Sequence, residues 1–348
     1  MVDTAPVPPT ERHRLDDARV LSPPAIEISK RPNPFQRAVH VWQYRELLAN
    51  LVRKELKVKY KNSVLGFLWT LLNPMLYLVV FSVVFQEVLQ VQIPYYAIFF
   101  LSGLLAWNFF ATAVSAGTGS IVGNAQLVQK VWFPREILPL ASMGSAMVHF
   151  VLQLSVLAGA MALFRRAPNL DYFPALALAV VVLLILCAAL AIALSAVNVY
   201  LRDTEHLLEL VMLAWFWMSA IVYPYQLVAD RLGPSREWWA SFNPMIPVIT
   251  TFHKALYNPS SPFFWYTNGP TDPPGWTKLG PDGQLHPVVP EKILPTKIPD
   301  QAQSAVPMDH TLGWFLTHLA WVGGVSVLLL FGALWLFGRL EDNLAEEI

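Results

Sequence analysis

Long apolar stretches without charged residues dominate the pattern of hydrophobic and polar positions along the chain. Each stretch is long enough to cross a hydrocarbon layer of roughly 30 Å as a helix. The six stretches are Val64–Phe85, Pro94–Val114, Ile137–Phe164, Pro174–Val197, Leu210–Ala229 and Thr311–Gly338. The pattern therefore predicts an all-α membrane protein with six transmembrane helices, five of them within residues 64–229 and the last at 311–338.

A basic amphipathic segment, residues 41–63, precedes the first span. Its apolar positions, spaced by three and four, are Leu47, Leu48, Leu51, Val52 and Leu56. This spacing predicts a helix in the membrane interface, with its apolar side toward the lipid and its cations among anionic headgroups. The cations assigned to this lipid-headgroup contact are Arg53, Lys54, Lys57, Lys59 and Lys61.

Composition and charge agree with a membrane protein and indicate its orientation. Of 348 residues, 55% are hydrophobic and only 14% are charged, whereas about a quarter are charged in a typical soluble domain. The formal net charge is zero, yet 12 of the 24 Lys and Arg residues lie before Ser63. This excess predicts a cytoplasmic N-terminus, and an even number of spans then places the C-terminus in the cytoplasm too. It is a poor signal for nucleic-acid binding, because it runs directly into a membrane span.

Three segments lie outside the predicted spans. Residues 1–40 are rich in proline and read as a disordered cytoplasmic tail without a cleavable signal peptide. Residues 339–348 form a second cytoplasmic tail. Residues 230–310 form an extracytoplasmic loop, whose part from Asn258 to His310 holds 11 prolines and is predicted to be an extended, poorly structured insertion.

The loop after the second span, from Gly117 to Leu140, is polar but keeps an apolar side. Two prolines, Pro134 and Pro139, bracket the start of the third span. Periodicity alone fits a short cytoplasmic helix that docks onto a partner and an ordinary surface loop equally well.

The chain lacks the residues that catalysis or ion coupling would need. No GxxxxGK[ST] phosphate loop occurs, so any ATPase that drives transport is a separate polypeptide. The spans contain no Asp, Glu, Lys or Arg, which argues against an ion-coupled carrier and a membrane-embedded hydrolase. His149 and His318 are interpreted as hydrogen-bonded packing residues. We therefore predict no catalytic residue, no metal site, no disulfide at the lone Cys187, and no cofactor in this chain.

Aromatic residues recur along the first span at intervals of four, with Asn73 filling one gap, and gather again in the fifth span. Interface belts and helix packing explain such residues well. A sugar channel explains them too, because pyranose rings stack on aromatic faces and their hydroxyls bind amides. The residues assigned to such a substrate channel are Trp69, Asn73, Tyr77, Phe81, Phe85, Trp215, Trp217 and Tyr223.

Four segments resemble one protein family over residues 40–258 and, more weakly, in the last span. They read ELKVKYKNSVLGFLWTLLNPML, NAQLVQKVWFPREILPL, NVYLRDTEHLLEL and REWWASFNPMIPVITTFHKAL. They are similar to the permease subunits of bacterial ABC-2 type exporters, which move lipid-linked O-antigen, teichoic acid, galactan or related glycans. One departure is Leu201, which separates Tyr200 from Arg202 where the family usually has Tyr-Arg-Asp.

The resemblance implies a homodimer in the bacterial inner membrane, assembled with two copies of an ATP-binding subunit that holds ATP and Mg. It also implies a polyprenyl-linked polysaccharide substrate, a channel lined by the first and fifth spans, and short re-entrant helices before the last span. Residues expected to dock the ATPase are Asn124, Leu127, Lys130, Trp132, Arg135, Arg202, Asp203 and Glu205. The alternatives are an ATP-independent carrier and a membrane scaffold for glycan synthesis.

Overall fold

The computed structural model describes most of the helical part of the chain. The described residues are 34–63, 65–66, 68–88, 93, 95–225, 242–257, 263–266, 275–279, 285–287, 311–341 and 347. Most of the predicted tail and most of the predicted insertion lie outside these residues, and their boundaries stay predictions.

The described chain is built mainly from helices. In order they are α2 (Pro34–Gln43), α3 (Arg45–Tyr60), α4 (Leu68–Phe81), the π-helix η1 (Ser82–Val88), α5 (Tyr96–Gly123), α6 (Ala125–Lys130), α7 (Ile137–Leu163), the 3-10 helix η2 (Leu170–Tyr172), α8 (Phe173–Tyr200), α9 (Thr204–Met218), α12 (Met245–Phe252), the π-helix η3 (His253–Tyr257) and α13 (Leu312–Leu340). The membrane part is all helical, as the sequence predicts.

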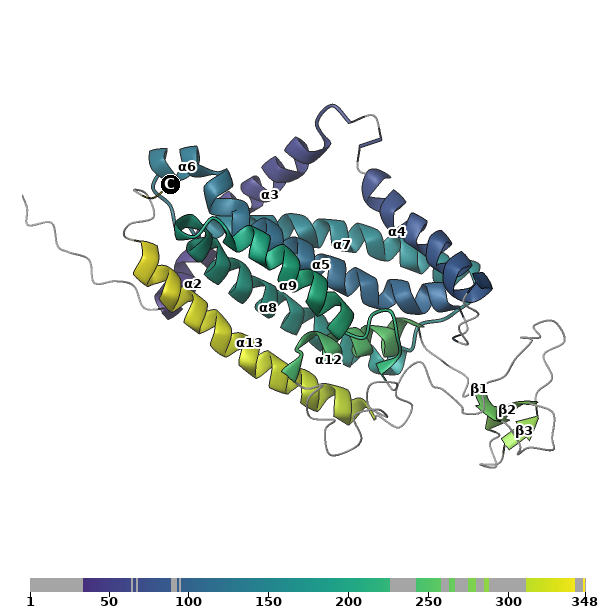
Figure 1. The fold of residues 1–348 in the computed structure, drawn as a ribbon. Coiled ribbons are helices and arrows are strands. Elements are labelled where there is room, and N and C mark those ends of the chain that lie inside the picture. Colours follow the sequence, from purple (N-terminus) through teal and green to yellow (C-terminus); the bar gives the residue numbers. More distant parts are fainter. Residues whose placement is uncertain are drawn as a thin grey trace, which may run out of the picture.

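Helix α5 forms the centre of the bundle (Figure 1). It packs along α7 and α8, while α13 packs along the other side of α8. Its aromatic residues Phe99, Phe100 and Phe110 are fully buried in the main core. Because α2, α6 and the end of α13 meet at one end, we call it the α6 end; the opposite end, where α5 begins, is the Tyr96 end.

Five described helices are long and apolar enough to cross a membrane. They cover Leu68–Phe85, Tyr96–Gly123, Ile137–Leu163, Leu170–Tyr200 and Leu312–Leu340. They correspond to the first, second, third, fourth and sixth predicted spans. The predicted fifth span, Leu210–Ala229, is not among them.

The fifth span differs because its helix stops early. Helix α9 has 15 residues, about 22 Å at 1.5 Å per residue, which is shorter than a hydrocarbon core. It ends at a turn in which Ala220 has a left-handed φ of 52°. The chain still runs the length of the bundle, because the Tyr96 hydroxyl donates to the Val222 carbonyl at 2.5 Å. Six crossings stay a prediction, and residues 226–241 lie outside the described residues.

The predicted interface helix, residues 41–63, is two helices that meet at Tyr44. The apolar side of α3 packs on protein: Leu51 is buried, and Val52 lies against α7 at Gly144, where an added Cβ would come within 2.8 Å of it. Helix α3 therefore follows α7 closely. The expectation that this apolar side faces lipid was wrong for these two residues, because α7 covers it.

Two short elements precede α13. Helix α12 is buried throughout and packs on α5, α8 and α13, so it forms part of the core. Within the predicted insertion, the strands β1 (Phe263–Tyr266), β2 (Gly275–Leu279) and β3 (Leu285–Pro287) pair antiparallel in that order. The prediction of a poorly structured insertion did not include this sheet, because prolines interrupt any alternating pattern there.

The close contact between α5 and α8 can be tested with a matched pair of substitutions. Gly117→Ala would place its Cβ 2.6 Å from the Cβ of Ala191 on α8, so overpacking should destabilise the protein by about 1–3 kcal/mol. Gly159→Ala in α7 meets nothing within 4 Å and should be neutral or slightly stabilising. Thermal unfolding in one detergent compares the two, and equal midpoints would contradict the close packing.

Candidate functional site

The predicted docking segment lies at the α6 end of the bundle. Helix α6 is followed by Val131 and Trp132, which are 52% and 83% exposed, and by Phe133, which is 4% exposed. Lys130 is exposed as well. The exposed Trp132 thus lies between two buried residues, Val128 in α6 and Phe133. Such an arrangement holds a large aromatic ring outward on a rigid support.

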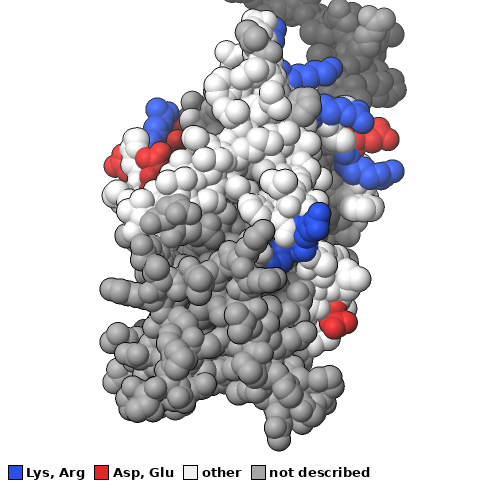
Figure 2. All heavy atoms as spheres, turned by 90° about the vertical axis from the view of Figure 1, so that its right-hand side faces the viewer, with Lys and Arg blue, Asp and Glu red and all other residues white. Residues whose placement is uncertain are grey.

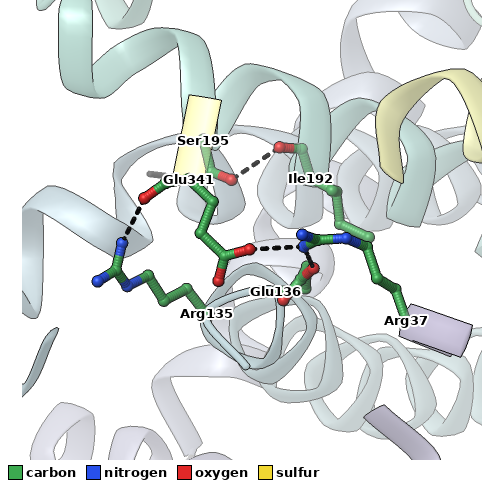
Figure 3. A network of polar contacts seen from close by, with 6 residues as sticks. All are labelled: Arg37, Arg135, Glu136, Ile192, Ser195 and Glu341. Carbon is green, nitrogen blue, oxygen red and sulfur yellow. Dashed lines mark hydrogen bonds and ion pairs between the residues drawn. The ribbon is translucent and has the colours of Figure 1, made fainter. Parts of the chain in front are cut away.

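A polar network fixes the chain directly after this tryptophan (Figure 3). Glu136 precedes α7, is 1% exposed and accepts a hydrogen bond from Arg37 of α2 at 2.5 Å. The same guanidinium contacts the Glu341 carboxylate at 2.7 Å, and Arg135 donates to the Glu341 backbone carbonyl at 2.8 Å. The Tyr200 hydroxyl also donates to the Leu340 carbonyl at 2.7 Å. Four helices, α2, α7, α8 and α13, are joined here.

Burial sets the electrostatics of this network. It raises the pKa of Glu136, as does the nearby Glu341 charge, while Arg37 opposes both effects. Burial by itself would lower the pKa of Arg37, but the two carboxylates raise it above its ordinary value. Arg37 is therefore charged at all physiological pH values, and Glu136 depends on it for compensation.

The other predicted docking residues lie on the adjoining elements. Arg202 and Asp203 are exposed between α8 and α9. Glu205 accepts a hydrogen bond from the Asn198 amide at 2.7 Å, so it also joins α9 to α8. Asn124 accepts a hydrogen bond from Lys54 of α3 at 3.2 Å, and Leu127 packs on the core cluster of the α6 end. The structure therefore places this predicted set at one end of the bundle.

The five cations assigned to lipid headgroups keep exposed surface on or just after α3. Figure 2 shows basic side chains along the upper right edge, with an acidic one among them, beside uncharged residues drawn in white. One of the five also reaches inward: the Lys59 ammonium group lies 3.1 Å from His149 of α7. Burial lowers the pKa of Lys59, and the charge of Glu55 opposes this shift.

Two predicted channel residues, Trp69 and Asn73, line a polar cavity together with Lys59. The cavity has a volume of about 420 Å³, and its lining includes Trp69, Asn73, Lys59 and His149. The structure thus brings together residues that the sequence analysis had assigned to the channel and to the lipid headgroup. His149 is hydrogen-bonded, as expected, but it faces a cavity.

The other channel candidates of α4 and η1 turn toward α5. The ring of Phe81 stacks on Phe100 with centroids 3.9 Å apart, and Phe85 stacks on Tyr96 at 4.5 Å. Tyr77 is partly buried and contacts Phe81 edge-on at 6.1 Å. These rings pack within one subunit, and their role in a channel stays a prediction.

The channel candidates of the predicted fifth span also differ in how far their rings are buried. Trp215 packs edge-on against Phe110 with centroids 5.0 Å apart, and its indole N–H donates to Asn243 at 2.8 Å. Tyr223 is partly buried, and its hydroxyl donates to the Trp217 carbonyl at 2.5 Å. Trp217 itself is 56% exposed. Among the described channel candidates, the indoles of Trp69 and Trp217 are the large rings left most open.

The fold is that of a helical protein with several candidate membrane spans. The sequence profile of the ABC-2 type transporter family matches residues 46–257, more than half of the 348 residues. The chain belongs to the ABC-2 type transporter family. The family profile and the relatives below together confirm its resemblance to the permeases of ABC-2 polysaccharide exporters.

Curated relatives carry the comparison further. The O-antigen export system permease protein RfbA of Myxococcus xanthus is 33% identical over 219 residues, which cover 62% of this chain and 82% of the relative. A protein of the same name from Klebsiella pneumoniae is 28% identical over 213 residues, with 61% and 81% covered. The polysialic acid transport protein KpsM of Escherichia coli is 20% identical over 213 residues, with 59% and 79% covered.

Sequence reasoning missed the residues that fix the site. Arg37 and Glu136 are 99 positions apart and Glu341 follows the last helix, so no local spacing relates them. The only local signal for Glu136 is a carboxylate at the very start of an apolar span. Tyr60 was missed as well, since its partner His149 on α7 is 89 positions away.

The buried ion pair predicts a specific pattern of stability. Arg37→Met leaves the Glu136 carboxylate buried without a cation, which should cost about 3–5 kcal/mol. The double change Arg37→Met with Glu136→Met removes both charges and should recover most of that loss, because Glu341 is partly exposed and can turn to water. Thermal unfolding of the two variants gives the answer. A double variant less stable than Arg37→Met would contradict the assignment.

Proposed function

We propose that this chain is the permease subunit of an exporter that moves a polyprenyl-linked polysaccharide across the bacterial inner membrane. Two copies would form the pathway, and two copies of a separate ATP-binding subunit would drive it. The curated relatives support this proposal, because two of those compared above are O-antigen export permeases and one is a polysialic acid transport protein.

The observation that carries the ATPase partnership is Trp132. An 83% exposed indole beside Lys130 is costly to leave in water and is typical of a surface that receives a partner. The polar network after it anchors the segment to four helices. A force applied at Trp132 would therefore act on α7 and α13 together.

The first and last described helices support a cytoplasmic α6 end. The Arg37–Glu341 ion pair holds α2 and the end of α13 together, so these two helices meet on one side of the bundle, as an even number of spans requires. Lys130, Arg135 and Arg202 lie at this end as well, which follows the excess of cations in cytoplasmic loops.

The docking surface can be tested by changing its exposed residues alone. Lys130→Glu combined with Trp132→Ala should leave the protein inserted and folded, but should abolish co-purification of a co-expressed ATP-binding subunit and stop export. Arg135 is left unchanged, because its bond to Glu341 is structural. Trp321→Ala on α13, where the indole is 64% exposed, is the control and should retain the ATPase.

Three outcomes would contradict this proposal or favour an alternative. One is normal co-purification and export in the Lys130→Glu, Trp132→Ala variant. Another is glycan transport by vesicles that hold this chain without any ATP-binding subunit, which would favour the ATP-independent carrier. Loss of glycan synthesis on deletion, with export otherwise intact, would favour the scaffold.

The open and the stacked aromatic residues should respond differently to truncation. Trp217→Ala should slow export and leave stability nearly unchanged, since the indole is 56% exposed and free to meet a sugar ring. Phe81→Ala should lower the free energy of unfolding by roughly 3 kcal/mol, because it removes stacking on Phe100. Export per folded molecule and thermal unfolding are measured on both variants. An equal loss of stability in Trp217→Ala and Phe81→Ala would contradict the distinction between an open and a packed ring.

A further inference from the structure

The cavity of about 420 Å³ lies deep along the bundle, between the end of α3, the start of α4, and the middles of α5 and α7. At 1.5 Å per residue, His149 is about 18 Å along α7 from Ile137, and Asn108 is about 22 Å along α5 from Gly123. Both positions fall near the middle of candidate membrane spans. Polar groups at such depth are costly in lipid and mark binding or transport sites.

A chain of hydrogen bonds positions a cation in this cavity. Lys59 lies 3.1 Å from His149 Nε2, and the Tyr60 hydroxyl lies 3.0 Å from Nδ1 of the same ring. With Lys59 protonated, Nε2 accepts its hydrogen bond, and the Nδ1–H donates to Tyr60, which in turn meets Thr70 on α4. The ring orientation is therefore fixed by three elements, and His149 acts as a positioning residue for the ammonium group.

The charge of Lys59 is not neutralised by an ion pair within the part of the chain that the structure describes. The carboxylate of Glu55, one turn earlier on α3, accepts a hydrogen bond from Ser142 at 2.8 Å. Two further donors of Lys59 remain for a ligand.

Three amides face the same cavity from different helices. They are Asn73 of α4, Asn108 of α5 and Gln153 of α7, and none makes a side-chain hydrogen bond to the described residues. Trp69, which is 56% exposed, adds an open aromatic face beside them. A cation, several amides and an indole together suit a ligand that carries an anionic oxygen and hydroxyls on a ring.

We propose that this cavity binds the phosphoryl group and the adjoining sugar of a lipid-linked glycan. The phosphoryl oxygens would accept hydrogen bonds from Lys59. The amides of Asn73, Asn108 and Gln153 would bind sugar hydroxyls, and Trp69 would stack on the ring. The mid-depth position favours a headgroup attached to a lipid over a free anion. This assignment rests on the proposed export function and names where the substrate's headgroup is held.

The test is a binding titration with purified permease in lipid nanodiscs. The main probe is a polyprenyl pyrophosphate carrying one hexose; the comparison probes are the same lipid without the hexose, inorganic pyrophosphate and phosphatidylglycerol. Lys59→Gln should weaken the binding of both polyprenyl probes by roughly ten-fold or more, which is the loss expected when a charge-assisted hydrogen bond is removed. Arg45→Gln, which removes an exposed cation of the same helix that is outside the headgroup set, should change binding by less than about two-fold.

A second variant separates sugar recognition from phosphate recognition. Asn108→Leu keeps the side-chain volume and should weaken only the binding of the hexose-bearing probe. The sugar-free lipid should bind with unchanged affinity. Thermal unfolding of each variant confirms that it is folded. Equal losses of binding in Arg45→Gln and Lys59→Gln would overturn the proposal, since they would reflect surface charge alone. Inorganic pyrophosphate bound as tightly as the lipid would overturn the choice of a lipid headgroup.

Export measured with an ATP-binding subunit distinguishes this proposal from the function on which it rests. Export by the wild type with headgroup binding unaffected by Lys59→Gln would sink the cavity assignment and leave the proposed function standing. Binding that depends on Lys59, together with no export of any lipid-linked glycan, would sink the proposed function and leave a lipid-phosphate site.

Discussion

The buried carboxylate of Glu136 is the constraint on which the α6 end depends. A carboxylate that is 1% exposed at the start of a long apolar helix needs a cation at hydrogen-bond distance. Arg37 supplies it, and in doing so draws α2 against the end of α13, where Gly338 leaves room for the guanidinium at a distance of 3.0 Å from an added Cβ. The segment before Glu136 is held as a consequence, and Trp132 has no core left in which to bury.

The second organising contact is the course of α3 along α7. A basic amphipathic helix would ordinarily lie flat in the interface, with its apolar side in lipid. Here Val52 meets Gly144, where an added Cβ would come within 2.8 Å, and Lys59 reaches His149 further along the same helix. Gly144 allows α3 to approach α7 closely, and this approach brings Lys59 to the middle of α7. The predicted spans themselves contain no Lys or Arg. The cation beside the middle of α7 thus comes from outside the spans.

The sequence predicted the helices that have long apolar runs, because lipid forces every backbone group into internal hydrogen bonds. It did not predict where side-chain packing interrupts such a run. Trp215 and the residues after it are as apolar as a span, yet Asn243 binds both the Trp215 indole and the Met218 carbonyl at the end of α9, an interaction with no sequence signal. The site was predictable in part: exposed Lys130 and Trp132 follow from a polar loop with an apolar side. The partners of Glu136 and His149 could not be predicted, because each lies about 90 or more positions away in the sequence from the residue it binds.

Helix α7 connects the two sites in a way that neither site reveals alone. Its first turn follows Glu136 and the docking segment, and its middle carries His149, which holds Lys59 in the cavity about 18 Å away. A helix of 27 residues packed on α5 along its length moves as a rigid element. Any displacement of the docking segment that tilts α7 would therefore change the distance between His149 on α7 and Thr70 on α4, both of which bind Tyr60. Coupling of this kind needs no catalytic group in the membrane, which agrees with spans that carry no Asp, Glu, Lys or Arg.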